Sequence, residues 1–399
     1  MMHGLHPLPE TRPADLGLCP LRLQRLLDAL QSDIDRARLP GAVVLVARHG
    51  QVALFEHLGQ RAPLRGEPMT RDTLFRIYSM TKPIVSAAVL MLVEQGRVQL
   101  EDPLSRWLPA FDRLEVLPAG ATERVAAERT PTVHDLLRHT AGFTYEFLGS
   151  AEVHRAYAQA RIGSRERDNA AFCDALATLP LLVQPGTAWE YSRATDVLGR
   201  LIEVVSGESL GAWLVAHVFE PLGMKDTRFD VPEDLLPRLA EPFPKDPDGA
   251  PMMLVTDYRR PGVLESGGGG LVSTARDYAR FLQFLLNRGA LDGVRLLGPQ
   301  IVDWMTADHL GHLPRASAGS AMLLPPGHGF GLGVAVRTVP GLAPTPGSVG
   351  MYYWGGLAGT SFFVDPALQL QAILMIQAPN QREHYRALFR NMVYAAVLD

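Results

Sequence analysis

Apolar positions recur at helical spacing over much of the chain, most densely in its middle. Between residues 21 and 38, Leu23, Leu26 and Leu30 fall on one face of an amphipathic helix. Helical spacing also predicts helices over residues 132–138, 152–182, 197–205, 209–218, 275–287 and 383–398. A continuous apolar run over residues 83–93 predicts one more helix, which stops near Gly96.

Strand patterns collect at the two ends of the chain. Residues 42–48 and 52–58 predict a β-hairpin, and four more strands are predicted over residues 331–338, 352–356, 360–365 and 371–377. We therefore expect an α+β fold with one antiparallel sheet built from both termini, flanked by helices, and a mainly helical lobe inserted in it. In this division, residues 18–100 and 295–399 form the sheet domain and residues 101–294 the helical domain, with the active site at their interface.

The composition is that of an ordinary soluble globular protein and narrows the choice of partner. Of 399 residues, 47% are hydrophobic and 20% charged, and the formal net charge is −4. Without a basic block the chain is a poor candidate for binding nucleic acid, and a small neutral or weakly charged substrate fits better. Cys19 and Cys173 stand far apart, so we expect free thiols with no disulfide framework and no zinc site.

Nothing in the apolar pattern predicts a membrane protein. The longest apolar stretch, residues 84–93, has about half the length that a bilayer span requires. The N-terminal residues 1–21 contain prolines and scattered charges and lack the apolar core of a secretory signal. We therefore expect a cytoplasmic protein without a membrane partner.

The strongest chemical signal is Ser79-Met80-Thr81-Lys82, at the start of the apolar helix. Positions i and i+3 place the Ser79 hydroxyl and the Lys82 amine on one helical face. A serine hydroxyl becomes a nucleophile when a base takes its proton, and a lysine with a lowered pKa can be that base. The helix N-terminus adds N–H groups that stabilise an oxyanion. The S-x-x-K pattern is the nucleophile motif of penicillin-recognising enzymes.

Tyr191 is the second candidate catalytic residue. It lies in Trp189-Glu190-Tyr191-Ser192-Arg193, between a Pro-Gly turn and a predicted helix, so its side chain can face a cleft. Beside a lysine ammonium a phenol can lose its proton below its usual pKa of about 10 and act as a general base. Taken alone, such a segment more often holds a packed aromatic whose hydroxyl binds the backbone.

Taken together, several motifs resemble the serine β-lactamase-related superfamily, on its class C side. The resemblance extends over about residues 41–377 and implies the β-lactamase and penicillin-binding-protein fold. It is carried by Ser79-Met80-Thr81-Lys82, Leu137-Arg138-His139-Thr140-Ala141-Gly142, Tyr191-Ser192, Pro221-Leu222-Gly223-Met224 and the segment from Gly267 to Thr274.

Two departures from the β-lactamase pattern favour an esterase. The Y-x-N motif would require asparagine where this chain has Arg193, and Trp354-Gly355-Gly356 stands where β-lactamases carry K-T-G. Replacing that lysine by an indole removes the anchor for a substrate carboxylate and leaves an apolar wall, which suits neutral esters. The W-G-G form is similar to family VIII carboxylesterases.

The resemblance implies a two-step acyl transfer that needs neither metal nor cofactor. Lys82 and Tyr191 deprotonate Ser79, which attacks the ester carbonyl, and Tyr191 then protonates the leaving alkoxide. The oxyanion is expected to bind the backbone N–H groups of Ser79 and Leu357. Trp354, Gly355 and Gly356 are the expected substrate-binding residues. Asp196 either orients this network or is an exposed carboxylate at a helix start.

Other candidate residues fit the sequence less well. Gly207-Glu208-Ser209-Leu210-Gly211 matches the nucleophile elbow G-x-S-x-G, but a helix precedes it where the elbow requires a strand, so Ser209 is expected to be a helix cap. His139 is expected in a structural turn, and His328 is expected to pack near the cleft without completing a triad.

Two alternatives to a small-ester carboxylesterase stay open. The first keeps the nucleophile and changes the substrate to a β-lactam or a D-aminoacyl peptide, or transfers the acyl group to an alcohol. The second is a non-catalytic, penicillin-binding-like sensing domain, which the intact Ser79, Lys82 and Tyr191 argue against.

Overall fold

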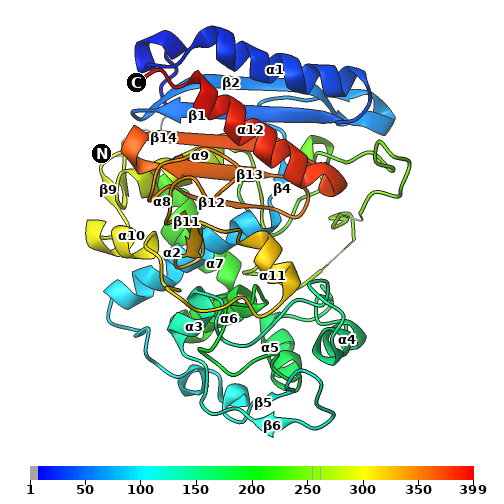
Figure 1. Ribbon diagram of the computed structural model, residues 1–399, viewed down its shortest axis with the longest axis vertical. Helices are drawn as coiled ribbons and strands as arrows, with labels where there is room; N and C mark the ends of the chain where they lie inside the picture. The colour runs from blue at the N-terminus through cyan, green and yellow to red at the C-terminus, as the bar shows by residue number, and fades with distance from the viewer. Residues whose placement is uncertain (1–7, 254, 261) are drawn as a thin grey trace.

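The computed structural model describes residues 8–253, 255–260 and 262–399. Its central feature is an antiparallel sheet with strand order β10-β11-β12-β13-β14-β1-β2-β3 (Figure 1). The strands are Gly41–Arg48 (β1), Gln51–Ala62 (β2), Glu67–Pro68 (β3), His328–Phe330 (β10), Ala335–Arg337 (β11), Tyr352–Gly355 (β12), Ser361–Asp365 (β13) and Leu370–Ile376 (β14). Both ends of the chain contribute to this one sheet, which confirms the expected α+β fold.

Strand β1 joins the two ends of the chain. It pairs with β2 on one side and with β14 on the other, where Val44 lies opposite Leu374. Every residue of β1 is buried, because helices cover both faces of the sheet. Alternate residues point to opposite faces, so Val43 and Val44 belong to different apolar cores.

Helices from opposite ends of the chain cover one face of the sheet. These are α1 (Pro20–Asp35) and α12 (Arg382–Ala396), which lie side by side in Figure 1. The other face packs against α9 (Ala275–Leu286), whose Tyr278 ring lies 5.3 Å from the Phe362 ring of β13. Helix α2 (Thr81–Glu94) lies in the core on this second side, buried from its first residue through Leu92.

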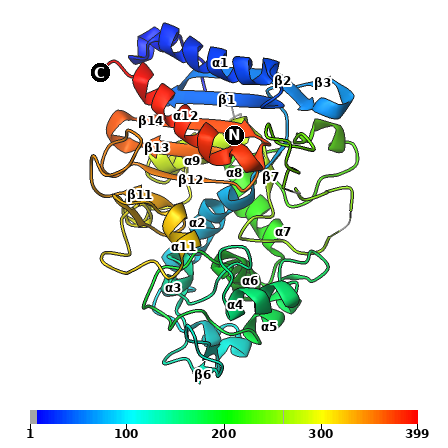
Figure 2. The ribbon, with the colours of Figure 1, turned by 45° about the vertical axis from the view of Figure 1, so that its right-hand side comes forward.

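The middle of the chain supplies most of the remaining helices. They are α3 (Val133–Leu137), α4 (Glu152–Gln159), α5 (Asn169–Ala177), α6 (Ala194–Ser206) and α7 (Leu210–Leu214). Figure 2 shows α3 to α6 gathered at the end of the molecule opposite α1. Thr132 and Asp135 form the capping box of α3, as the sequence predicts. The proposed division at residues 100 and 295 stays a prediction, and α9, from within the middle segment, packs on the sheet.

Several elements differ from their predicted extent. The predicted helix over residues 152–182 is two helices, because the chain turns between them with Arg161 in the left-handed region (φ 46°). The predicted strand over residues 331–338 is only β11, since Gly333 (φ 98°) turns the chain back onto β10. Helix α7 continues as a π-helical turn, Val215–Phe219, into α8 (Glu220–Leu222). Helices α10 (Pro299–Met305) and α11 (Ala318–Leu323) were not predicted.

Short strand pairs complete the described structure. They are β4 (Phe75–Arg76) with β7 (Val272–Ser273), β5 (Glu115–Val116) with β6 (Val125–Ala126), and β8 (Ala290–Leu291) with β9 (Val294–Arg295). Residues 1–7, part of the segment searched for a secretory signal, lie outside the described residues. Within the described ranges no single helix is long and apolar enough to cross a membrane; Ala194–Ser206 and Leu210–Leu222 meet that test only as a pair, bent by 81°.

We expect Leu90→Ala, in the centre of α2, to destabilise the protein by about 2–5 kcal/mol, the usual cost of a cavity in a packed core. Leu90 has no exposed surface, whereas Leu21 of α1 is 74% exposed and Leu21→Ala provides the matched control. Urea unfolding followed by circular dichroism measures both. Equal effects of the two substitutions would contradict the packing described for α2.

Candidate active site

Ser79 lies in a single 3₁₀ turn, Tyr78–Met80, that leads directly into α2. The residue before it, Tyr78, has φ 42°, a left-handed conformation that is costly for a bulky side chain. The Tyr78 hydroxyl accepts a hydrogen bond of 2.8 Å from the Thr256 N–H, which anchors this conformation. No local sequence pattern predicts this strained turn, which places Ser79 in the wall of a cavity.

Lys82 occupies the first turn of α2 and is completely buried. Its amine donates hydrogen bonds to the Gly268 carbonyl (2.7 Å) and the Tyr145 hydroxyl (2.9 Å), and its Nζ lies 3.4 Å from Ser79 Oγ. Burial lowers the pKa of Lys82 to about 7, Asp196 opposes this shift, and Arg193 adds to it. A substantial fraction of the amine is therefore neutral at pH 7 and able to accept a proton.

Tyr191 meets Ser79 and Lys82 from the connection that precedes α6. Lys82 Nζ lies 4.5 Å from the centre of the Tyr191 ring, and Ser79 is a hydrogen-bonding neighbour of its hydroxyl. The Trp354 indole N–H donates to the same hydroxyl at 3.1 Å. Burial raises the pKa of Tyr191 well above its usual value, so the expected early loss of its proton is wrong. The phenol is protonated at neutral pH, because the effect of burial on its pKa outweighs the lowering effect of its hydrogen bonds with Ser79 and Trp354.

Tyr145 is a member of the site that the sequence analysis missed. It follows the His139–Gly142 turn, and its hydroxyl accepts the hydrogen bond from Lys82. The Arg193 guanidinium lies 4.7 Å above its ring, and the Tyr191 ring lies 5.3 Å away. Its place three residues after a turn of the recognised pattern was the available signal.

Asp196 is buried, so its reading as an exposed carboxylate at a helix start is wrong. It accepts hydrogen bonds from the Gly268 N–H (3.1 Å) and from the Ser266 hydroxyl. A Cβ at position 268 would lie 2.6 Å from the Asp196 carboxylate, which explains a glycine there. Asp196 thus fixes the segment whose Gly268 carbonyl binds Lys82.

The W-G-G segment approaches the nucleophile from β12. A Cβ at Gly356 would collide with the Ile77 carbonyl, so only glycine lets the turn between β12 and β13 pack this closely. Leu357 lines the same cavity as Ser79. Among the described residues, the backbone N–H groups of Ser79 and Leu357 donate to no other group, so both are free to bind an oxyanion.

The cavity has a volume of about 1020 Å³ and contains Ser79 in its wall. Apolar and aromatic side chains line much of it, including Tyr145, Phe147, Tyr191 and Trp354. Gly355 is also in the wall, whereas Gly356 lies behind it and supports the turn. A site of this volume holds a small organic substrate together with a water molecule or a second reactant.

The structure also shows where the other residues considered in the sequence analysis lie. Ser209 caps α7, its Oγ accepting from the Ala212 N–H at 3.2 Å, and a helix precedes it as expected. His139 (φ 58°) lies in a turn with its Nδ1 3.1 Å from Ser192 Oγ and its ring 4.9 Å from that of Tyr191. His328 lines the cavity. Among the described side chains, no group of three or more His, Cys, Asp or Glu is placed to hold a metal ion.

Comparisons with known proteins agree with this geometry. The family model described as Beta-lactamase matches residues 23–396. This chain belongs to the beta-lactamase family. Esterase EstB of Burkholderia gladioli is 36% identical to it over 384 residues, covering 91% of this chain and 92% of the relative. Lovastatin esterase of Penicillium rubens is 31% identical over 372 residues, with 87% and 91% covered.

A solved structure extends the agreement to three dimensions. EstCE1, described as a hydrolase with promiscuous acyltransferase activity, has a TM-score of 0.77 and 30% identity, covering 94% of this chain and 98% of its own. The recognition of the serine β-lactamase superfamily near family VIII carboxylesterases is therefore confirmed, as is its fold. This beta-lactamase family member is an enzyme, a serine hydrolase of the esterase kind.

The buried amine predicts the pH dependence of this family member. Lys82 is charged below its lowered pKa of about 7 and must be neutral to take a proton, so kcat/KM should rise with pH through about 7 and then level off. Asp196→Asn removes an influence that raises this pKa, so the rise should move to lower pH. Measurements of kcat/KM between about pH 5 and about pH 9 locate the midpoint of this rise.

Asp112→Asn, which removes an exposed carboxylate outside the cavity, is the matched control and should leave the profile in place. A profile that Asp196→Asn leaves unmoved, or moves to higher pH, would contradict the assignment of the rise to Lys82.

Proposed function

We propose that this chain is a carboxylesterase that hydrolyses small esters with short acyl chains through an acyl-enzyme on Ser79. The observation that carries the proposal is the placement of the Ser79 hydroxyl 3.4 Å from a buried lysine amine whose pKa is about 7. Such an amine is a competent base for a serine at neutral pH. The esterase relatives support an ester as the substrate.

In the first step Lys82 takes the Ser79 proton while Ser79 Oγ attacks the ester carbonyl carbon. The carbonyl oxygen becomes an oxyanion and binds the free N–H groups of Ser79 and Leu357. When the bond to the alcohol oxygen breaks, Tyr191, which is protonated at neutral pH, donates its proton to the departing alkoxide. The products are the acyl-enzyme and the free alcohol.

In the second step a water molecule replaces the alcohol. The phenolate of Tyr191 accepts a proton from this water, which attacks the acyl carbonyl and forms a second oxyanion in the same site. Collapse of this intermediate releases the carboxylic acid and restores the Ser79 hydroxyl with the proton that Lys82 holds. The Trp354 N–H stabilises the transient phenolate through its hydrogen bond to the Tyr191 oxygen (3.1 Å).

Tyr145 keeps the Lys82 amine in position during both steps. Its hydroxyl and the Gly268 carbonyl accept the two N–H groups of the neutral amine. The lone pair of the amine is therefore directed toward Ser79. The ring of Tyr145 is in turn held under Arg193, the residue that replaces the asparagine of the Y-x-N motif. The loss of that asparagine leaves β-lactam hydrolysis the weaker alternative.

Acyl transfer to an alcohol is the second candidate function. The cavity of about 1020 Å³ is larger than one short-chain ester requires, so it can admit an alcohol beside the acyl-enzyme. The similarity to EstCE1, a hydrolase with acyltransferase activity, supports this candidate. Product analysis with added primary alcohols would distinguish transfer from hydrolysis.

We expect Ser79→Ala to abolish turnover of p-nitrophenyl butyrate and stoichiometric labelling by a fluorophosphonate, because the attacking hydroxyl is gone. Ser209→Ala, which removes a helix cap remote from Lys82, is the matched control and should retain both activities. Mass spectrometry of the wild-type protein trapped with a slow ester should find the acyl group on Ser79.

Two results would overturn the esterase proposal. Faster turnover of nitrocefin than of p-nitrophenyl butyrate would make the chain a β-lactamase. Absence of labelling in a folded wild-type protein would favour the sensing-domain alternative.

Tyr191→Phe should lower kcat by about 10² to 10⁴-fold, as expected when general acid–base help is lost. Tyr145→Phe removes a hydrogen bond to the amine but no proton-transfer group, so we expect a smaller loss of kcat and a shifted pH profile. Steady-state kinetics over the pH range measure both variants. Equal losses with unshifted profiles would contradict the separate roles given to the two tyrosines.

A further inference from the structure

The cavity wall carries an excess of positive charge. Its charged residues are Glu146, Arg165, Arg193, Arg382, Glu383, Arg386 and Arg390, so three of the five arginines have no matching glutamate. The chain as a whole has a formal net charge of −4, and the excess is therefore a local property of the cavity. Clefts lined by charge of one sign concentrate substrates of the opposite sign.

Outside α12, the Arg165 guanidinium lies over the Tyr258 ring and donates to backbone carbonyls, so α12, with three of the five arginines, carries most of the positive charge of the wall. Arg193 is matched by Glu146 at 2.6 Å. Glu383, by contrast, is shared between Arg382 (3.3 Å) and Arg386 (2.8 Å), and its side chain is 68% exposed. A single exposed carboxylate compensates two arginines only weakly, because water screens it.

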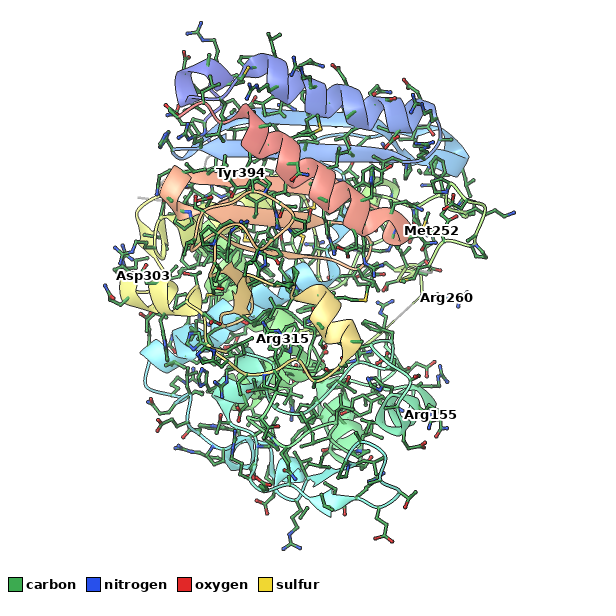
Figure 3. All side chains as sticks on the ribbon, viewed as in Figure 1. Arg155, Met252, Arg260, Asp303, Arg315 and Tyr394 are labelled. Atoms are coloured by element: carbon green, nitrogen blue, oxygen red, sulfur yellow. The ribbon has the colours of Figure 1, made fainter. Side chains whose placement is uncertain are left out.

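Arg390 is the arginine of α12 that lacks a carboxylate partner. Its guanidinium stacks on the Tyr353 ring at 4.1 Å and donates to Thr345 Oγ1 at 3.3 Å, and none of the described carboxylates lies within ion-pairing distance of it. Tyr394, labelled in Figure 3, lies on the next turn of α12 and donates to Asp365 at 2.7 Å. Arg390 therefore presents unused N–H donors to the cavity.

A second buried group marks the same part of the wall. His328, 5% exposed, has its Nδ1 3.2 Å from the Pro326 carbonyl, and its Nε2 has no hydrogen-bond partner among the described residues. Burial and the positive charge of Arg390 lower the pKa of His328 to about 4. This histidine is neutral at pH 7, and its environment already carries an unbalanced positive potential.

Arg386 brings this positive side next to the reacting atoms. Its Nη2 donates to the Gly356 carbonyl at 2.5 Å, one residue before Leu357, a proposed oxyanion donor. Arg390 lies one turn further, about 6 Å along the helix axis. A substrate whose carbonyl binds at Ser79 can therefore place a second group against α12.

We propose that the preferred substrates are esters that carry a carboxylate, which binds Arg390 and Arg386 on the cavity side of α12. The inference rests on the proposed esterase function and revises the expectation of neutral esters drawn from Trp354. Trp354 stands on the strand where β-lactamases carry a lysine, so the strand itself has no cation there. Helix α12 instead supplies two guanidinium groups beside the same strand. Planar guanidinium groups bind carboxylates through paired hydrogen bonds.

The test compares matched esters that differ only in charge. One pair varies the alcohol side, 3-carboxyphenyl butyrate against 3-carbamoylphenyl butyrate, and the other varies the acyl side, the 4-nitrophenyl monoester of adipic acid against that of adipamic acid. In at least one pair, kcat/KM of the wild-type enzyme should be about tenfold higher for the carboxylate, as one partly desolvated charge-assisted hydrogen bond supplies. The gain should fall as ionic strength rises from about 50 mM to about 500 mM.

Substitutions in α12 test whether its arginines cause the preference for the carboxylate esters. Arg390→Gln and Arg386→Gln should each bring the ratio of the two kcat/KM values close to one, while Arg390→Lys, which keeps the charge, should retain part of it. Arg113→Gln removes an exposed arginine outside the cavity and should leave the ratio at the wild-type value. Thermal unfolding of each variant checks that it is folded, and the salt dependence of the wild type provides a readout that needs no variant.

The outcomes separate this inference from the esterase proposal. A wild-type enzyme that cleaves the carbamoyl esters as fast as the carboxylates in both pairs overturns the inference and leaves the esterase intact. A ratio that survives in both folded glutamine variants overturns the assignment to Arg386 and Arg390. Failure to cleave any of the four esters would instead refute the proposed function.

Discussion

The structure depends on the burial of one amine, that of Lys82. Removing a charged ammonium from water is costly unless the group becomes neutral or finds partners. Here the Gly268 carbonyl and the Tyr145 hydroxyl accept its hydrogen bonds, and buried Asp196 offsets part of its charge. The same burial that makes the amine costly brings its pKa close to neutrality, where it can exchange protons with Ser79.

The side chains of the candidate site come from segments that are distant in sequence. Ser79 and Lys82 follow the N-terminal hairpin, Tyr145 and Tyr191 lie on connections of the middle segment, and Trp354 comes from β12. The sheet makes this meeting possible, because β1 and β14 pair and hold the two ends of the chain together. Glycines at 268 and 356 then permit contacts that any side chain would block.

Much of the fold follows from local patterns in the sequence. The hairpin of β1 and β2, the apolar helix α2, the capping box at Thr132 and the antiparallel sheet from both ends are all readable from periodicity and caps. The break between α4 and α5 and the short α11 are not, since they depend on tertiary contacts that override weak local preferences.

The site was readable only in part. Motif spacing singled out Ser79, Lys82 and Tyr191, which the structure brings together, because their pattern is local or recurrent. The part that Tyr145 plays in the site and the burial of Asp196 were not predicted. Both depend on contacts between segments about fifty residues or more apart in the chain. The high pKa of Tyr191 is likewise a property of burial, which a sequence pattern does not contain. The arginines of α12 read as an ordinary helix surface until the helix is placed against the cavity.

The pairing of β1 with β14 also has a consequence for biosynthesis. The ribosome makes Ser79 before it makes the W-G-G turn and β14, the strand that pairs with β1. A nascent chain that ends before the turn therefore carries Ser79 without Leu357, the proposed oxyanion donor. In the proposed mechanism, hydrolysis can begin only once both segments have been made, so a product truncated before them lacks esterase activity however stably its helical part folds.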